Sequence, residues 1–362
     1  MSFPTTHFSS KERALAAFAH QEPDRVPVDY SANPGIDLRL KQHFGLNPAD
    51  DEGLLQALGI DFRYVWAPYT GPRLHPELPG RTVDLWGIHR RWVEHDTGGY
   101  WDYCDFPLKD ADLETIANWP LPSPDNFDYA HVREAAHRNS DYCIVAGSAG
   151  VGDIINSTGM IRTMEQVLVD LLTDNEAGLR YIDRKMAVML EVTERILVAG
   201  RGLIDVFFLG EDLGTQIGPM ISPRLFRKHL RPRLQRFIDL AKAYDLPVMF
   251  HSCGSSSWVF PDLVEMGVDV IDTLQPEATN MSPAYLKPRF GDQMAFHGCI
   301  STGGPVAYGT VEDVIKNVEE TLAIMMPGGG YALAPSHALQ DNSPTQNVLA
   351  MYETARQAGR YR

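Results

Sequence analysis

The sequence predicts an α/β protein built as a closed (β/α)₈ (TIM) barrel. Short apolar runs of strand type recur along the chain and are mostly separated by helical segments, a pattern typical of a parallel sheet. Eight such units are the number that closes a barrel. An open doubly wound sheet is the alternative, but no G-x-G-x-x-G follows the first strand and no Walker sequence is present. The eight strand candidates are 25–30, 61–66, 143–147, 203–209, 246–250, 268–274, 294–299 and 330–334.

Helical segments separate most of these strands. The first helix comes before any strand, because Ser9 and Ser10 precede KERALAAFAH, which has the pattern of a capped amphipathic helix. Another helix is expected from Ser222 to Tyr244, with Pro223 at the first position, where proline is favoured. The remaining helices are expected at 36–44, 51–58, 164–172, 176–198, 259–266, 283–287, 311–325 and 344–356.

Residues 67–140 interrupt this alternation between the second and third strands. They are rich in proline, glycine and aromatic residues. Thr82–Val93 and Thr97–Asp105 alternate like the two arms of a β-hairpin, with Asp96 and Gly98 near the turn. We interpret this region as an excursion on the barrel that has no core of its own, so the chain is expected to form one domain, 1–362.

Composition narrows the class of protein. The formal net charge of −15 argues against a nucleic-acid or anionic-membrane partner, because both need a basic surface. No run of about 18 apolar residues is present, and the N-terminus lacks the apolar region of a signal peptide. The four cysteines are scattered and form no disulfide framework, which suits a reducing compartment. A cytoplasmic protein that acts on a small molecule is therefore expected.

A candidate metal site begins at the end of the fifth strand, in the run MFHSCG. His251 and Cys253 are two residues apart, so in extended chain their side chains point to the same side. Zinc readily takes nitrogen and sulfur ligands, and Gly254 lets the backbone turn just past them. The pair alone is a weak signal, because buried cysteines and hydrogen-bonded histidines are also common in cores.

Polar residues follow other strands as well, and the carboxyl ends of barrel strands are where active sites form. His337 follows the eighth strand and Cys299 ends the seventh. The predicted zinc set is therefore His251, Cys253 and His337, with Cys299 as the competing third ligand. The alternatives are that His337 hydrogen-bonds a loop and that Cys299 packs as a small apolar side chain.

The fourth strand ends in two adjacent acids. Glu211 is a candidate fourth ligand or an acceptor that orients an imidazole, and Glu211 or Asp212 is a candidate to bind or protonate substrate. Bracing of the neighbouring loop is the alternative for both. Aromatic residues such as Tyr30 and Tyr64 are candidates to wall an apolar pocket, with core packing as their alternative role.

Several segments resemble the uroporphyrinogen decarboxylase-like superfamily, above all LGEDLGTQIGPMISP, VMFHSCGS, FHGCISTGGPVAYGT and GGYALAPSHALQ. The resemblance implies a (β/α)₈ barrel. Metal-free decarboxylases of this superfamily carry an arginine-rich segment resembling MRQAGRYLPEY after the first strand, where this chain has VDYSANPGIDLRL with Arg39 alone. Zinc-dependent methyltransferases that work with corrinoid proteins resemble this chain in having His-x-Cys after the fifth strand. They usually place a cysteine ligand in a segment like APGCG, where APSHA here puts His337.

The resemblance and the polar strand ends together predict a zinc-dependent methyltransferase. Its Zn²⁺ acts as a Lewis acid on a small methylated substrate, with a methoxy compound favoured over a methylamine or a thiol. The methyl group moves to or from cobalamin supplied by a partner corrinoid protein, and a homodimer is plausible in this superfamily. The alternative is a metal-free decarboxylase, with Asp61 as the acid that the resemblance implies. A non-catalytic module that binds a corrinoid is the third possibility.

Overall fold

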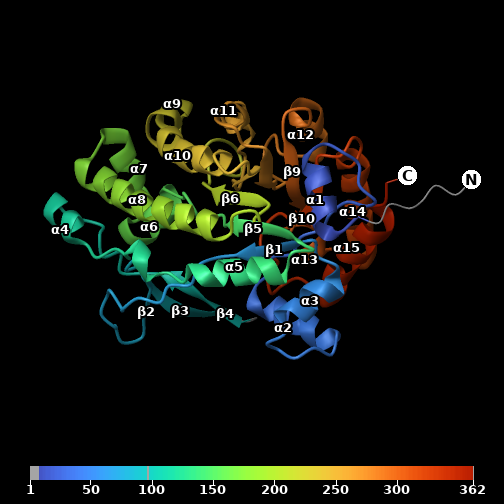
Figure 1. The fold of residues 1–362 in the computed structure, drawn as a ribbon, viewed down its shortest axis with the longest axis horizontal. Helices are drawn as coiled ribbons and strands as arrows, with labels where there is room; N and C mark the ends of the chain where they lie inside the picture. Colours follow the sequence, from blue (N-terminus) through green and yellow to red (C-terminus); the bar gives the residue numbers. More distant parts are fainter. Residues whose placement is uncertain (1–7, 96–97, 362) are drawn as a thin grey trace, which may run out of the picture.

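A computed structural model describes residues 8–95 and 98–361 (Figure 1). Its centre is a curled sheet of seven parallel strands, and neighbouring strands follow one another in chain order. The helices lie around this sheet, as strand–helix alternation predicts (Figure 1). The strands are β1 (Phe62–Val65), β5 (Cys143–Gly147), β6 (Val206–Gly210), β7 (Val248–His251), β8 (Val270–Thr273), β9 (Ala295–Ile300) and β10 (Tyr331–Pro335).

The first predicted strand, 25–30, does not form a regular strand, and this corrects the expectation of eight regular strands. Proline has no backbone N–H, so Pro27 cannot donate to a ladder. The segment is nevertheless extended and bonded on both sides. Asp29 N donates to Leu333 O and Leu333 N to Pro27 O, each at 2.9 Å, while Asp61 N donates to Val28 O at 2.9 Å. The segment therefore lies between β10 and the start of β1.

The helices largely match the expected ranges. In α1 (Ser10–Phe18), Ser9 Oγ accepts from Glu12 N and the Glu12 carboxylate accepts from Ser9 N, so the predicted cap is a capping box. The helix expected at 222–244 is divided by one π-helical turn at Phe226–Leu230 into α9 (Pro223–Leu225) and α10 (Arg231–Lys242). The other helices are α2 (Pro34–His43), α3 (Asp51–Leu58), α4 (Leu113–Asn118), α5 (Tyr129–Arg138), α6 (Ile155–Arg162), α7 (Met164–Thr173), α8 (Glu176–Ala199), α11 (Phe260–Met266), α12 (Pro283–Phe290), α13 (Pro305–Tyr308), α14 (Val311–Met325) and α15 (Thr345–Ala358), with 3₁₀ turns at Pro124–Asn126 and Ser257–Val259.

Between β1 and β5 the chain forms a small antiparallel sheet of β2 (Thr82–Val83), β3 (His89–His95) and β4 (Gly98–Tyr103). Asp96 and Thr97, at the expected turn, lie outside the described residues. A small apolar cluster joins this region to helices of the main body, through residues such as Ile88 and Tyr181.

The interior of the curled sheet is filled by alternate side chains of its strands. Val145 and Phe208 are examples, and both are buried. Ala14 and Phe18 of α1 belong to the same cluster. Because α1 also carries Arg13, which pairs with Asp61 just before β1, it covers the amino ends of the strands. The carboxyl ends are left for a cavity. None of the helices in the described part of the chain has the length and apolar character that crossing a bilayer requires.

Candidate functional site

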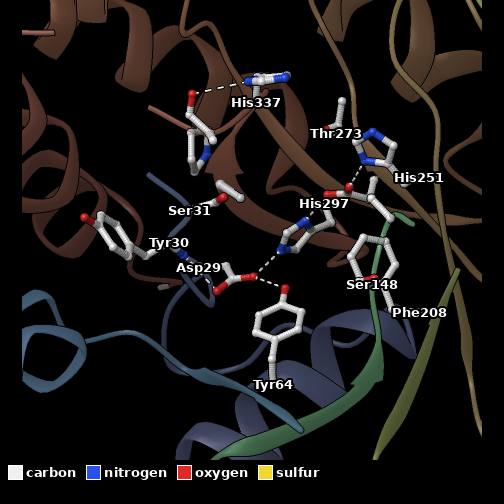
Figure 2. Close-up of a pocket in the computed structure, with 15 residues that line it drawn as sticks. Asp29, Tyr30, Ser31, Tyr64, Ser148, Phe208, His251, Thr273, His297 and His337 are labelled. Carbon is white, nitrogen blue, oxygen red and sulfur yellow. Dashed lines mark hydrogen bonds and ion pairs between the residues drawn. The ribbon is translucent and has the colours of Figure 1, made fainter. Parts of the chain in front are cut away.

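A cavity of about 440 Å³ lies at the carboxyl ends of the strands (Figure 2). This volume is in the range of small-molecule sites. Within the described part of the chain, no lysine or arginine lines it. Its lining residues are Asp29, Tyr30, Ser31, Tyr64, Ser148, Ala149, Phe208, His251, Asp272, Thr273, His297, Ala334, Pro335, His337 and Ala338.

A candidate metal centre lies beside this cavity and contains the predicted His251 and Cys253. Ligand atoms of Asp212, His251 and Cys253 all lie within 4.8 Å of one another, and no other such group is found among residues 8–95 and 98–361. His251 Nε2 is 3.4 Å from Cys253 Sγ and 3.5 Å from Asp212 Oδ1. Sulfur, nitrogen and oxygen donors at this spacing fit zinc, and three ligands leave a position open for substrate.

Asp212 is held in place as an ionised acceptor. Cys253 N donates to its Oδ1 at 2.8 Å, and Asn156 Nδ2 donates to its Oδ2 at 2.6 Å. Burial alone would raise the pKa of Asp212, but the hydrogen bond and charge of His251, with these two donors, lower it to about 2. The sequence singled out Asp212 as a catalytic candidate, and the structure places it at a ligand position.

The two predicted third ligands lie outside this group. His337 is exposed at the cavity, where its Nδ1 is 3.3 Å from Ala338 O and 3.3 Å from Gln340 Nε2. Cys299 is buried, with a positive φ of 75°, and burial with the charge of Glu277 raises the pKa of its thiol to about 12. Asp212 is thus the third member that the geometry provides.

Glu211, predicted as a ligand or catalytic group, points into the protein. Its fully buried carboxylate accepts hydrogen bonds from Ile154 N at 2.7 Å and Ile155 N at 3.2 Å, at the start of α6. Burial and the charge of Asp153 raise its pKa well above the ordinary value. Glu211 does not line the cavity, and its two hydrogen bonds connect the end of β6 to the start of α6.

Asp61 also lies away from the cavity, before the amino end of β1. Its fully buried carboxylate accepts from Arg13 Nη1 at 2.7 Å, from Arg25 Nη1 and Nη2 at 2.7 and 2.9 Å, and from Val28 N at 2.8 Å. These bonds occupy both oxygens. The acid of the alternative decarboxylase is therefore not placed where a substrate in this cavity reaches it.

Sequence reasoning missed a chain of hydrogen bonds that runs across the cavity from His251 (Figure 2). His251 Nδ1 is 2.6 Å from Asp272 Oδ2, and Asp272 Oδ1 is 2.6 Å from His297 Nδ1. His297 Nε2 is 3.1 Å from Asp29 Oδ2, which also accepts from Tyr64 Oη at 2.5 Å. The chain joins β7, β8, β9, the 25–30 segment and β1.

This chain of hydrogen bonds fixes the orientation of the His251 imidazole. Burial alone would lower the pKa of His297, but Asp272 and Asp29 raise it to about 10. Hydrogen bonds from both imidazoles lower the pKa of Asp272, although burial opposes this. Asp272 therefore stays an acceptor, holds the Nδ1–H of His251 and leaves Nε2 facing Asp212 and Cys253, as metal-binding imidazoles are usually held.

We predict that Asp272→Asn weakens zinc binding by about 10- to 100-fold, the usual cost of losing a partner that orients a metal-binding imidazole. Competition with a chromophoric chelator measures the affinity. Asp262→Asn is the matched control, because Asp262 is also a buried aspartate but pairs with Arg227 and Arg231 away from the cavity. Equal zinc affinity in both variants would contradict the orienting role.

The comparisons with known proteins agree with this fold. The family model described as uroporphyrinogen decarboxylase (URO-D) matches residues 131–358, so the chain belongs to that family. A methyltransferase from Methanosarcina mazei has a similar structure, with a TM-score of 0.66 and 19% sequence identity, covering 97% of this chain and 99% of that one. At this identity the likeness shows a shared fold.

Two more distant structures also match. The IolI protein with a bound zinc atom covers 70% of this chain and 92% of its own at 13% identity, with a TM-score of 0.34. D-Psicose 3-epimerase from Clostridium cellulolyticum H10 covers 69% and 93% at 10% identity, with a TM-score of 0.35. The comparison with curated proteins finds no matching sequence.

Proposed function

We propose that this protein is a zinc-dependent methyltransferase that moves a methyl group between a small methylated substrate and the cobalamin of a corrinoid protein. The observation that carries the proposal is the grouping of Asp212, His251 and Cys253 beside a substrate-sized cavity. Membership of the URO-D family and the similarity to a methyltransferase fold support it. Under this proposal the third ligand is Asp212, and His337 remains a candidate for a further ligand because it lines the same cavity.

Zinc bound by these side chains would supply a Lewis acid to a heteroatom of the substrate. The protein's own part is to hold the donors in place. Asp272 orients the His251 imidazole, and Asn156 and the backbone N–H of Cys253 fix the Asp212 carboxylate. Tyr30, Tyr64 and Phe208 provide an aromatic wall on which the apolar part of a substrate packs.

A methoxy compound remains the favoured methyl donor. No lysine or arginine from the described residues lines the cavity, so a substrate with an anionic tail would lack a cationic partner there. A neutral methyl ether needs no such partner. The same observation counts against the alternative, a metal-free decarboxylase, because carboxylate substrates are commonly held by arginine or lysine.

We expect zinc affinity to rise with pH. Burial alone would lower the pKa of His251, but hydrogen bonds to Asp212, Asp272 and Cys253 raise it well above its ordinary value in the metal-free protein. Burial raises the pKa of the Cys253 thiol as well, although His251 opposes this. Zinc must displace both protons, so affinity should increase by up to about tenfold per pH unit for each proton while both groups are protonated.

Calorimetric titration with zinc, in buffers of different ionisation enthalpy, measures the protons released and the affinity at each pH. The sign is set by the protonated forms, which compete with the metal and disappear as pH rises. An affinity that stays constant from about pH 6 to about pH 8 would show that these two groups are not the ligands.

The function is tested with zinc-loaded protein, cob(I)alamin as the methyl acceptor, and panels of methoxy compounds, methylamines and thiols. We expect formation of methylcobalamin with equal formation of the demethylated product from a methoxy compound. Cys253→Ser is expected to abolish it. Carbon dioxide release from a carboxylic acid by metal-free protein, with no methyl transfer, would establish the decarboxylase instead. Binding of cobalamin without turnover of any panel would favour a non-catalytic module.

A further inference from the structure

Asp29 has an unused hydrogen-bond acceptor position at the cavity. A carboxylate offers about four lone-pair positions. Among the described residues, three donors bond to this one: Tyr30 N donates to Oδ1 at 2.8 Å, and Tyr64 Oη and His297 Nε2 bond to Oδ2. One position on Oδ1 is therefore open. Asp29 lines the cavity, and it is 4% exposed, so bulk water does not satisfy it freely.

The polar side chains bonded to Asp29 cannot supply the missing donor. Both ring nitrogens of His297 already face carboxylates, and the hydroxyl proton of Tyr64 is committed to Asp29. Thr273 Oγ1 donates to Ser336 O at 3.2 Å. No described lysine or arginine lines the cavity either, so no cationic side chain there pairs with the Asp29 carboxylate.

The three donors also hold Asp29 in one position. Tyr64 comes from β1 and His297 from β9, so two separate strands fix the carboxylate (Figure 2). The Tyr64 ring faces Phe208 with a centroid distance of 6.3 Å, and both rings line the cavity beside the carboxylate. A fixed acceptor next to aromatic rings suits a flat ligand that carries an N–H or O–H group.

We propose that Asp29 anchors the substrate by accepting a hydrogen bond from a hydroxyl or protonated amino group on the methyl donor. This inference rests on the proposed function, in which the ligand is a methyl donor. It narrows the substrate class to methylated compounds that bear a hydroxyl or protonated amino group away from the reacting methyl. His297 and Tyr64 act as positioning residues for Asp29. Asp29 Oδ1 is the atom that contacts the substrate.

The first test uses unmodified zinc-loaded protein and needs no turnover. Isothermal titration calorimetry compares a methoxyphenol with the dimethoxybenzene that has the same ring positions, and both with the matching methoxybenzylamine. We expect the hydroxyl or the amine ligand to bind about 10- to 100-fold more tightly than the dimethoxy ligand, the range for a hydrogen bond to a charged group. The tighter-binding ligand of these two shows whether a hydroxyl or a protonated amine is the group that donates to Asp29. Equal affinity for all three, or no binding of either donor-bearing ligand, overturns the proposal.

The second test uses Asp29→Asn, which keeps the size of the side chain. The amide has one acceptor oxygen in place of two, and three protein donors already compete for it, so the open position disappears. We expect the preference for the donor-bearing ligand to fall below about threefold, measured on variant protein loaded with zinc to the same content as the unmodified protein. An unchanged preference in a folded variant overturns the proposal.

Asp205→Asn is the matched control, because Asp205 is also a buried aspartate that accepts a backbone N–H, from Ile144, but it does not line the cavity. If Asp29→Asn does not fold, the ligand comparison on unmodified protein decides alone. A clear preference in protein that transfers no methyl group would leave the anchor in place and remove the proposed function. Methyl transfer by protein that binds all three ligands equally would support the proposed function and remove the anchoring role of Asp29.

Discussion

Replacing Cys253 by serine is expected to remove zinc from the purified protein. Cys253 supplies the sulfur of a group whose ligand atoms lie within 4.8 Å of one another. A serine hydroxyl stays protonated near neutral pH and is a poor zinc ligand, so the loss should exceed the 10- to 100-fold that follows removal of an orienting partner. We expect affinity to fall by more than about 100-fold. Metal analysis after gel filtration and chelator competition measure it.

Cys104→Ser is the control for this experiment. Cys104 directly follows β4 in the chain and is buried. It belongs neither to the cavity lining nor to the candidate ligand group. It should keep its zinc. Full zinc content in Cys253→Ser would mean that the metal binds elsewhere. Comparison with Asp212→Asn, His337→Ala and Cys299→Ala then shows which residue completes the set, because loss of a ligand should lower zinc affinity more than loss of an orienting partner does.

Replacing Asp61 by alanine is expected to destabilise the fold by about 3–5 kcal/mol, the cost of breaking a buried ion pair by removing one partner. Arg13 and Arg25 would lose the carboxylate that both bond to, and Val28 N would lose its acceptor. Arg13 would keep its two hydrogen bonds to Asp24, whereas Arg25 would be left with the backbone carbonyls of Val26 and Gly59. Chemical denaturation monitored by circular dichroism measures the change.

The same variant separates the two candidate functions. Asp61 lies at the amino ends of the strands and away from the candidate ligand group, so zinc affinity in the surviving folded protein should be unchanged. Asp51→Ala is a surface control, because Asp51 is largely exposed and its pairing with Lys41 should contribute little. A stable Asp61→Ala protein that has lost its activity would contradict our placement of this residue and return the decarboxylase to consideration.

Much of the fold was predictable because buried parallel strands are continuous apolar runs with helices between them. Runs such as CIVAG and VIDT became β5 and β8 almost at the expected residues. The segment 25–30 was not predictable in the same way. Its apolar residues match a strand, but Pro27 removes a ladder donor, and only the tertiary structure shows that the remaining groups bond on both sides.

At the candidate site, sequence spacing predicted one pair of neighbouring ligand residues but not the third residue of the group. His251 and Cys253 lie together, as i and i+2 positions in extended chain predict. Glu211 and Asp212 are adjacent acids, and nothing in their order shows which faces inward. The start of α6 binds Glu211, so Asp212 is left to face His251. A third ligand was expected after the eighth strand, whereas the acid that the fold brings next to the pair is Asp212, which follows β6.

Two further acids were hidden inside predicted strands. Asp29 and Asp272 occur within the apolar runs VPVDY and VDVIDTL, where periodicity indicates burial but not chemistry. A buried carboxylate needs hydrogen-bonding or charged partners. An aspartate inside an apolar run was therefore the sequence feature that indicated a buried polar network. The partners, Tyr64 and His297, come from strands far apart in sequence, so they could be identified only once the sheet had curled.

The extended segment that carries Asp29 is joined to the sheet less regularly than the strands are, by one isolated bridge to β10. It is tied to its neighbours by the backbone bonds of Asp29, Leu333 and Asp61, whereas β7 is laddered along its length to β6 and β8. Local opening should begin there, so these three amides should exchange with deuterium before those of β7. A ligand bound to Asp29 would stabilise this segment against local opening. Slower exchange at these three backbone amides would then report that the cavity is occupied.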